Sequence, residues 1–149
     1  MQISMEPIGY VVNNVDSPVD IGWGEIESKI VIKEELAATL KGLADFSHIL
    51  VIFYMHQAQP PTVQQRRPQN RKDMPVLGLF AQRSKHRVNP IGVTAVSLIG
   101  LDRNRVIVRG LDAINDTPVL DIKPYYPHYD CPSEVRVPEW VDRLMNEYF

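Results

Sequence analysis

The stretch from Gly78 to Gly92 concentrates side chains that can bind an anionic, aromatic ligand. The ring of Phe80 can stack on a purine. Arg83 and Arg87 each offer a planar guanidinium group that can donate two hydrogen bonds to a carboxylate or a phosphate. Gly22-Trp23-Gly24 lacks the third glycine of a Rossmann fingerprint, and the chain has no phosphate-loop lysine motif, so any nucleotide-like cofactor would be held on a non-Rossmann scaffold.

Two further stretches could carry acid–base chemistry. The segment from Asn115 to Tyr125 combines turn residues with Asp116, Asp121, Lys123 and a terminal tyrosine. His56-Gln57 is the second, and it stands where a continuous apolar segment gives way to a polar one. Histidine and carboxylate side chains are the commonest groups that move protons in active sites.

The charge of the chain is unevenly distributed. The formal net charge is -2, yet residues 66–87 hold seven basic side chains against one acid. The rest of the chain therefore carries nine basic and seventeen acidic side chains. A basic segment on an acidic body can be a local phosphate-binding surface. A solvated loop whose charges aid solubility would explain the same pattern.

Length and composition place the chain in the class of single-domain globular proteins, and we expect one domain over residues 1–149. Cys131 is the only cysteine, which excludes an internal disulfide or a multi-cysteine metal cluster. The four histidines are scattered, so no metal site is expected. No segment resembles a signal peptide or a membrane span, and we expect a cytoplasmic protein with no membrane partner.

The elements that must position these side chains are mostly short strands. Residues 26–33 alternate between apolar and polar positions, which is typical of a half-buried strand, whereas 48–56 is continuously apolar and indicates a buried one. Residues 33–43 and a segment opening at Pro138 predict two helices. Residues 57–75 are rich in proline and should form no regular element. The remaining predicted strands are residues 8–12, 76–80, 92–99, 106–108 and 118–122. This pattern favours a mainly β fold, a single-sheet barrel with one or two peripheral helices.

The three chemically dense stretches resemble one family, the TrmO-like proteins, also called TsaA-like or YaeB-like. The family signature Gly-x-Phe-x-x-Arg-Ser-x-x-Arg-Pro-Asn-Pro-Ile-Gly matches residues 78–92 apart from one position. Phe46-Ser47-His48, His56-Gln57, residues 121–125 and Pro7-Ile8-Gly9 match in the same order. The resemblance thus extends over nearly the whole chain.

The resemblance implies a non-Rossmann β-barrel that is a homodimer, binds S-adenosyl-L-methionine and uses transfer RNA. It also implies methyl transfer to the exocyclic nitrogen of threonylcarbamoyl-adenosine, next to the anticodon. By motif position, the expected cofactor-binding residues are His56, Gln57, Phe80, Arg83, Thr94, Asn115, Asp116, Thr117 and Pro118. The expected RNA-binding residues are Arg66, Arg67, Arg71, Lys72 and Arg87.

Asp121, His56 and Tyr125 are the candidate catalytic residues. Asp121 or His56 could take the proton from the acceptor nitrogen, and Tyr125 could stack on the base or hydrogen-bond to it. Each has a structural alternative. Asp121 could form an ion pair with Lys123 or an arginine, His56 could bond the backbone at the end of a strand, and Tyr125 could pack on the barrel.

The chain departs from the family pattern in three ways, and these departures affect the expected substrate more than the expected cofactor. Val88 replaces a proline, and Asn115-Asp116 replaces an Asp-Gly pair, so that a glycine-only backbone geometry is not expected at Asp116. The chain also ends soon after its last predicted helix, where family members carry an extension that helps to hold RNA. There are therefore two competing hypotheses: a methyltransferase that uses another acceptor, and a module that binds the cofactor without turnover.

Overall fold

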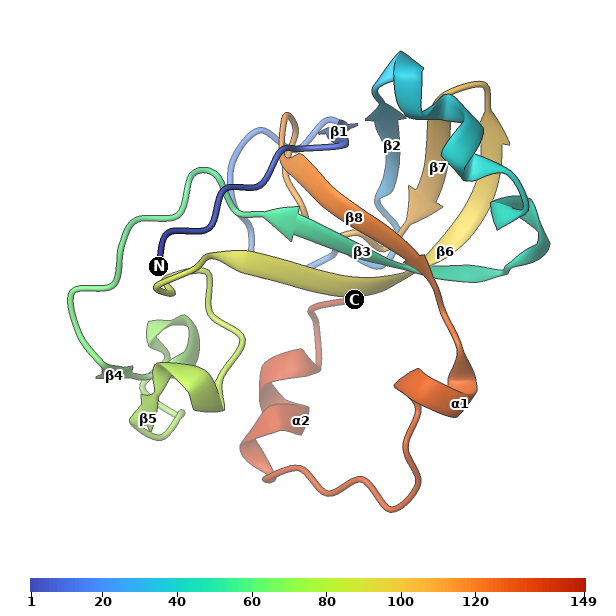
Figure 1. Cartoon of the computed structure of the whole chain (residues 1–149). Coiled ribbons are helices and arrows are strands. Elements are labelled where there is room, and N and C mark those ends of the chain that lie inside the picture. The colour runs from blue at the N-terminus through green and yellow to red at the C-terminus, as the bar shows by residue number, and fades with distance from the viewer.

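The computed structural model describes all 149 residues, and six antiparallel strands close into a barrel in the order β1-β2-β7-β6-β3-β8 (Figure 1). Each strand is therefore hydrogen-bonded on both sides. The bounds are β1 Gly9–Val12, β2 Glu27–Ile32, β3 His48–Tyr54, β6 Ile91–Asp102, β7 Arg105–Arg109 and β8 Pro118–Pro124. The expected single-sheet barrel is confirmed.

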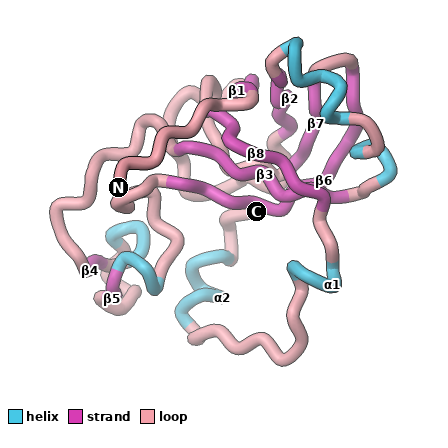
Figure 2. Tube along the Cα trace, in the orientation of Figure 1, coloured by secondary structure: helices cyan, strands magenta, loops and turns pink.

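Smaller elements lie outside the barrel. The 3-10 helices η1 (Glu34–Leu40) and η2 (Leu43–Asp45) connect β2 to β3. A two-stranded ribbon, β4 (Gln65–Arg66) with β5 (Leu77–Gly78), and helices α1 (Pro127–Asp130) and α2 (Trp140–Met145) gather beneath β6 in Figure 1. Two further 3-10 turns, η3 (Pro68–Asn70) and η4 (Leu79–Ala81), belong to the ribbon. Figure 2 shows that long loops join these pieces. No helix has the length and apolar character needed to cross a membrane.

The core fills the inside of the barrel with aliphatic side chains. Strand β3 shows how the sequence does this: Ile49, Val51 and Phe53 are buried, and the residues between them face outward. Alternation of this kind is dictated by the period of a strand, and small barrels are filled by side chains rather than hollow. Leu40 of η1 and Leu111, which follows β7, complete the core from outside the strands.

Several predicted elements differ in extent or type. The helix predicted over residues 33–43 is the shorter 3-10 helix η1, which packs Leu36 and Leu40 against the core. The strand predicted over 76–80 reduces to β5, since residues 79–81 turn into η4. The final helix begins at Trp140 and ends before Tyr148.

The proline-rich segment 57–75 is less irregular than predicted. Its Gln65 and Arg66 pair with Gly78 and Leu77, which builds the ribbon. Met74, within this segment, is almost fully buried. The prolines exclude a long strand here, but the two-residue strand β4 fits between Pro61 and Pro68.

Gly92 leaves room for the ring of Phe53, its partner across β3 and β6. A Cβ atom at Gly92 would lie 2.3 Å from Cζ of Phe53. We therefore expect Gly92→Ala to lower the free energy of unfolding by about 1–3 kcal/mol, the usual cost of overpacking a core. Urea unfolding followed by circular dichroism measures this change.

Gly100→Ala is the matched control, because Gly100 is on the same strand and a Cβ atom there meets nothing within 4 Å. Equal losses of stability in the two variants would contradict the steric explanation and would point to a general intolerance of β6.

Candidate functional site

The end of β3 brings His56 next to the close of the Gly78–Gly92 motif. The amide of Met55 donates to the carbonyl of Pro90 at 2.8 Å, which ties the two segments together. Nδ1 of His56 is buried and has no hydrogen-bond partner, whereas Gln57 is exposed. A buried polar atom without a partner is costly, so this nitrogen is suited to meet a polar atom of a bound ligand.

The arginine motif is stabilised by its own side chains. Arg87 donates to the carbonyls of Leu79 and Gln82 at 2.9 and 2.7 Å, and its guanidinium lies 5.8 Å from the centre of the Phe80 ring. Arg87 therefore shapes this turn, and its predicted contact with RNA stays a prediction. The Phe80 ring is 87% exposed and thus free to stack on a base.

Gln82 fastens this motif to the ribbon. Its side-chain nitrogen donates to the carbonyls of Arg66 and Leu77 at 3.0 and 3.2 Å. A cleft of about 180 Å³ opens beside these residues, and Arg66 and His86 line it together with Leu79 and the Gln59–Val63 segment. The two ends of the basic segment 66–87, at Arg66 and His86, therefore border one cleft.

Arg83 and Thr94 both adjoin the start of β6, and Thr94 bonds a carboxylate, Asp112, that the sequence did not single out. Arg83 donates to the carbonyl of Val93, and the hydroxyl of Thr94 donates to Asp112. The hydroxyl of Tyr148 donates to the other oxygen of Asp112 at 2.6 Å. Burial, followed by the negative charge of Asp112, raises the pKa of Tyr148 far above its ordinary value.

The turn between β7 and β8 holds the predicted residues Asn115 to Pro118 against β1. The side-chain oxygen of Asn115 accepts from the amide of Asn13 at 3.1 Å, and the amide of Asp116 donates to the carbonyl of Val11 at 2.8 Å. Thr117 is buried and Pro118 opens β8. Asn115 and Thr117 therefore shape the turn, and their contact with the cofactor stays a prediction.

Asp116 adopts a backbone conformation that favours glycine but is not restricted to it. Its φ is 62°, in the left-handed region. Asparagine and aspartate tolerate this region better than other side chains, because their short polar groups can bond locally. An aspartate can thus replace glycine at this position at a modest cost.

Asp121 and Lys123 point outward from β8 because the strand contains a bulge. The register with β3 passes from Phe53–Val119 to Ile52–Asp121 and so skips Leu120. A bulge re-aims the side chains that follow it. Val119 is buried in the core, whereas Asp121 is only half-buried.

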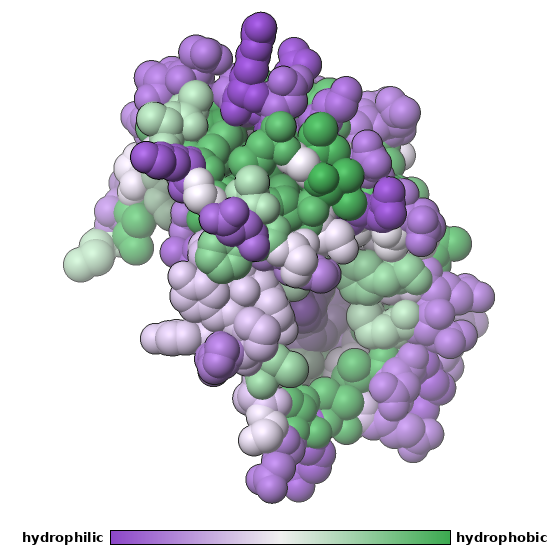
Figure 3. Space-filling view, turned by 90° about the vertical axis from the view of Figure 1, so that its right-hand side faces the viewer, coloured by the Kyte–Doolittle hydropathy of each residue, from purple (hydrophilic) through white to green (hydrophobic).

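The ion pair considered for Asp121 is present. Lys123 Nζ lies 2.6 Å from the Asp121 carboxylate, and this hydrogen bond raises the pKa of Lys123. Asp121 also borders an apolar cleft of about 480 Å³ between β8 and η1–η2. Figure 3 shows hydrophobic side chains gathered on this side, above a hollow that separates the barrel from the segments beneath it. A catalytic role for Asp121 stays a prediction.

Tyr125 follows β8 and lies beside the start of β3. Its ring centre is 6.4 Å from that of His48, and its amide donates to the His48 carbonyl at 3.1 Å. Burial and the neighbouring Cys131 raise the pKa of Tyr125.

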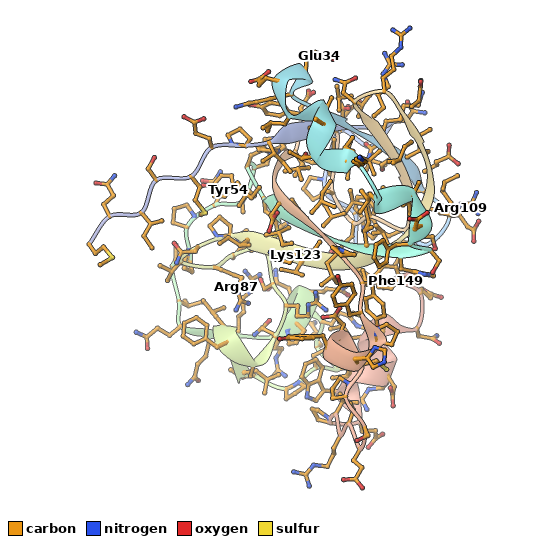
Figure 4. All side chains as sticks on the ribbon, turned by 45° about the vertical axis from the view of Figure 1, so that its right-hand side comes forward. Glu34, Tyr54, Arg87, Arg109, Lys123 and Phe149 are labelled. Atoms are coloured by element: carbon orange, nitrogen blue, oxygen red, sulfur yellow. The ribbon has the colours of Figure 1, made fainter.

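Figure 4 shows Lys123 and Arg87 in the band between the barrel and the segments beneath it, whereas Glu34 lies at the far end.

Two of the predicted site residues, Thr94 and Asp121, lie on opposite faces of the barrel wall. Thr94 shares the inward face of β6 with Val96, whereas Asp121 pairs with the outward Ile52. His56 and Arg83 adjoin the start of β6 through the contacts described above. Within a single chain, Asp121 forms no side-chain hydrogen bond or ion pair with any of the cofactor candidates.

The predicted RNA-binding segment is attached to α2. Arg71 forms an ion pair with Asp73 at 2.7 Å, which raises the pKa of Arg71 and lowers that of Asp73. Arg71 also donates to the carbonyl of Arg143 at 3.3 Å. Arg67 donates to the carbonyl of Met74. Lys72 is exposed and belongs to none of the ion pairs, so it is the freest cation of the group.

Comparison with known proteins agrees with this architecture. A model of the tRNA-methyltransferase O N-terminal domain matches residues 14–131. The chain belongs to the tRNA-methyltransferase O family. The predicted family resemblance is therefore confirmed, and residues 14–131 include every predicted site residue.

Two curated relatives illustrate the range of the family. An S-adenosyl-L-methionine-binding protein of Archaeoglobus fulgidus is 33% identical over 88% of this chain and 95% of its own length. The human tRNA (adenine(37)-N6)-methyltransferase is 37% identical over 67% of this chain, but only 23% of the human protein is covered.

The solved structures extend the likeness to the fold. The crystal structure of TrmO from Pseudomonas aeruginosa matches with a TM-score of 0.75 and 31% identity over 91% of this chain. The chain spans 62% of that protein. No group of three or more histidine, cysteine, aspartate and glutamate side chains is placed to share a metal ion.

The raised pKa of Tyr148 predicts a loss of stability in alkali. Below its ordinary pKa of 10.0 the phenol is protonated in both the folded and the unfolded chain. Above that pH only the unfolded chain ionises, so the free energy of unfolding should fall by up to about 1.4 kcal/mol per pH unit. Urea unfolding between about pH 9 and 11 measures the slope.

Tyr148→Phe should remove this contribution to the slope, and Tyr129→Phe, at an exposed tyrosine, should not. If the wild type and Tyr148→Phe lost stability equally with rising pH, the phenol of Tyr148 would not be held in its protonated form by the fold.

Proposed function

We propose that this chain is an S-adenosylmethionine-dependent methyltransferase that acts on the exocyclic nitrogen of the adenine next to the anticodon in transfer RNA. The match to the family domain over residues 14–131 carries the proposal. The names of the relatives support both parts of it. The Archaeoglobus fulgidus relative, whose length the chain nearly spans, is named for the cofactor, and the human relative is named for the reaction.

The residues at the start of β6 fit the polar groups of the cofactor. Arg83 is exposed and can receive a carboxylate with the part of its guanidinium that does not bond Val93. The unpartnered Nδ1 of His56 can bond a hydroxyl or amino group. Phe80 offers a free aromatic face for the adenine. The contacts of Arg83 and Phe80 would require no rearrangement, because both side chains are already exposed, whereas the buried Nδ1 of His56 would be reached only after its neighbours shift.

Most of the rate would come from positioning. The acceptor nitrogen is a poor nucleophile, because its lone pair is delocalised into the purine and, in threonylcarbamoyl-adenosine, into the carbamoyl group. S-adenosylmethionine supplies a methyl group on a sulfonium, which leaves readily under in-line attack. Holding two reactants in line can be worth effective molarities of about 10⁵ M or more. Asp121 would take the proton from the nitrogen, which adds about 10²- to 10⁴-fold.

The threonylcarbamoyl group, a homodimer and a cytoplasmic location complete the proposal. The outward position of Asp121 supports the dimer, since a second copy could bring this carboxylate to the cofactor residues of the first. The exposed basic segment supports an RNA acceptor rather than a small molecule. The location follows from the substrate.

The decisive experiment supplies labelled S-adenosylmethionine and two pools of total transfer RNA, one with and one without the threonylcarbamoyl modification. Nucleosides are then identified by mass spectrometry. We expect methylated threonylcarbamoyl-adenosine from the first pool alone. Product from neither pool, with the cofactor bound in a parallel titration, would replace the proposal with another acceptor or a non-catalytic binding protein.

Lys72 provides a test of the RNA surface. Lys72→Ala should weaken binding of transfer RNA and reduce the slope of log K against log salt by about 0.7–0.9, because one phosphate contact is lost. Fluorescence anisotropy over a salt series measures both quantities. Lys29→Ala is the control, at an exposed lysine on β2. Unchanged slopes for Lys72→Ala would remove Lys72 from the RNA surface.

A further inference from the structure

Asp112 joins three distant parts of the chain. It follows β7, and its two carboxylate oxygens accept hydrogen bonds from Thr94 on β6 and Tyr148 beyond α2. Hydrogen bonds to a charged acceptor are stronger than neutral ones. The carboxylate is therefore held from both sides, and its orientation depends on a residue 36 positions away in sequence.

Tyr148 is itself fixed by its backbone and its neighbour. The carbonyls of Glu147 and Tyr148 accept from the amides of Gly22 and Trp23 at 3.0 and 2.9 Å. A Cβ atom at Gly24 would lie 2.6 Å from the carbonyl carbon of Phe149, so this glycine leaves space for the segment. The position of Tyr148 is thus fixed by these backbone hydrogen bonds and by the close packing of Gly24 against Phe149.

The bond to Asp112 sets the direction of the Thr94 hydroxyl. A hydroxyl has one hydrogen and two lone pairs. Because Thr94 gives its hydrogen to Asp112, it offers only lone pairs to any other partner. S-adenosylmethionine carries an ammonium group, ribose hydroxyls and an adenine amino group, all of which donate. Arg83 bonds the carbonyl of the residue directly before Thr94, so both side chains adjoin the same strand end.

We propose that Tyr148 and Asp112 are positioning residues for S-adenosylmethionine: the hydrogen-bond chain from Tyr148 through Asp112 presents Thr94 as an acceptor for a donor group of the cofactor. The inference rests on the proposed function. It adds two residues that lie outside the matched motifs. It also makes the segment after α2 a part of the cofactor site, although no atom of that segment needs to touch the cofactor.

The test is a double-mutant cycle on the dissociation constant for S-adenosylmethionine, measured by isothermal titration calorimetry well below each melting temperature. Tyr148→Phe and Thr94→Val should each weaken binding about tenfold. Because both act through one chain, the double variant should be little weaker than either single variant. Thr94→Ser, which keeps the hydroxyl, should restore binding, and Tyr129→Phe should bind as the wild type does.

Each alternative outcome has a distinct meaning. Additive losses in the cycle, or wild-type binding by a folded Tyr148→Phe, would overturn the positioning role and leave the proposed function intact. Absence of binding by the wild type, or unchanged binding by Arg83→Ala, would count against the proposed cofactor site itself. Steady-state kinetics add a second readout, in which Tyr148→Phe should raise KM for the cofactor and leave KM for transfer RNA unchanged.

Discussion

Closure of the barrel is the constraint on which the candidate site depends. Strand β3 is paired with β6 on one side and β8 on the other, and β8 completes the ring against β1. Segments from the beginning, middle and end of the chain are thereby fixed relative to one another. The candidate site residues lie either on these strands, as Thr94 and Asp121 do, or on loops that start and finish at them, so the filled interior of the barrel supports both groups.

Several arginines of the basic segment 66–87 are engaged in contacts within the protein. Arg87 stabilises the turn of its own motif, and Arg67 and Arg71 are engaged by backbone carbonyls or by Asp73. Lys72 and the ring of Phe80 remain open to a partner. The number of positive charges in a sequence therefore exceeds the number available to RNA, because some of the arginines are engaged in hydrogen bonds within residues 66–87.

The sequence predicts the barrel well where local patterns decide the outcome. The alternation of residues 26–33 predicts β2, and the family motifs locate the turns. Local patterns fail where distant contacts decide. The segment 33–43, which packs Leu36 and Leu40 against the core from outside the barrel, forms a 3-10 helix, and Asp112 meets Tyr148 only after the chain has folded back. The outward direction of Asp121 depends on a skipped residue that no periodicity reveals.

That skipped residue, Leu120, makes the length of β8 as important as its composition. If the same sequence paired with β3 without a bulge, Leu120 would lie opposite Ile52 and Asp121 opposite the inward Val51, so that Asp121 and Lys123 would point into the aliphatic interior. The direction of these two side chains therefore depends on whether the bulge forms, and not only on which amino acids the segment contains.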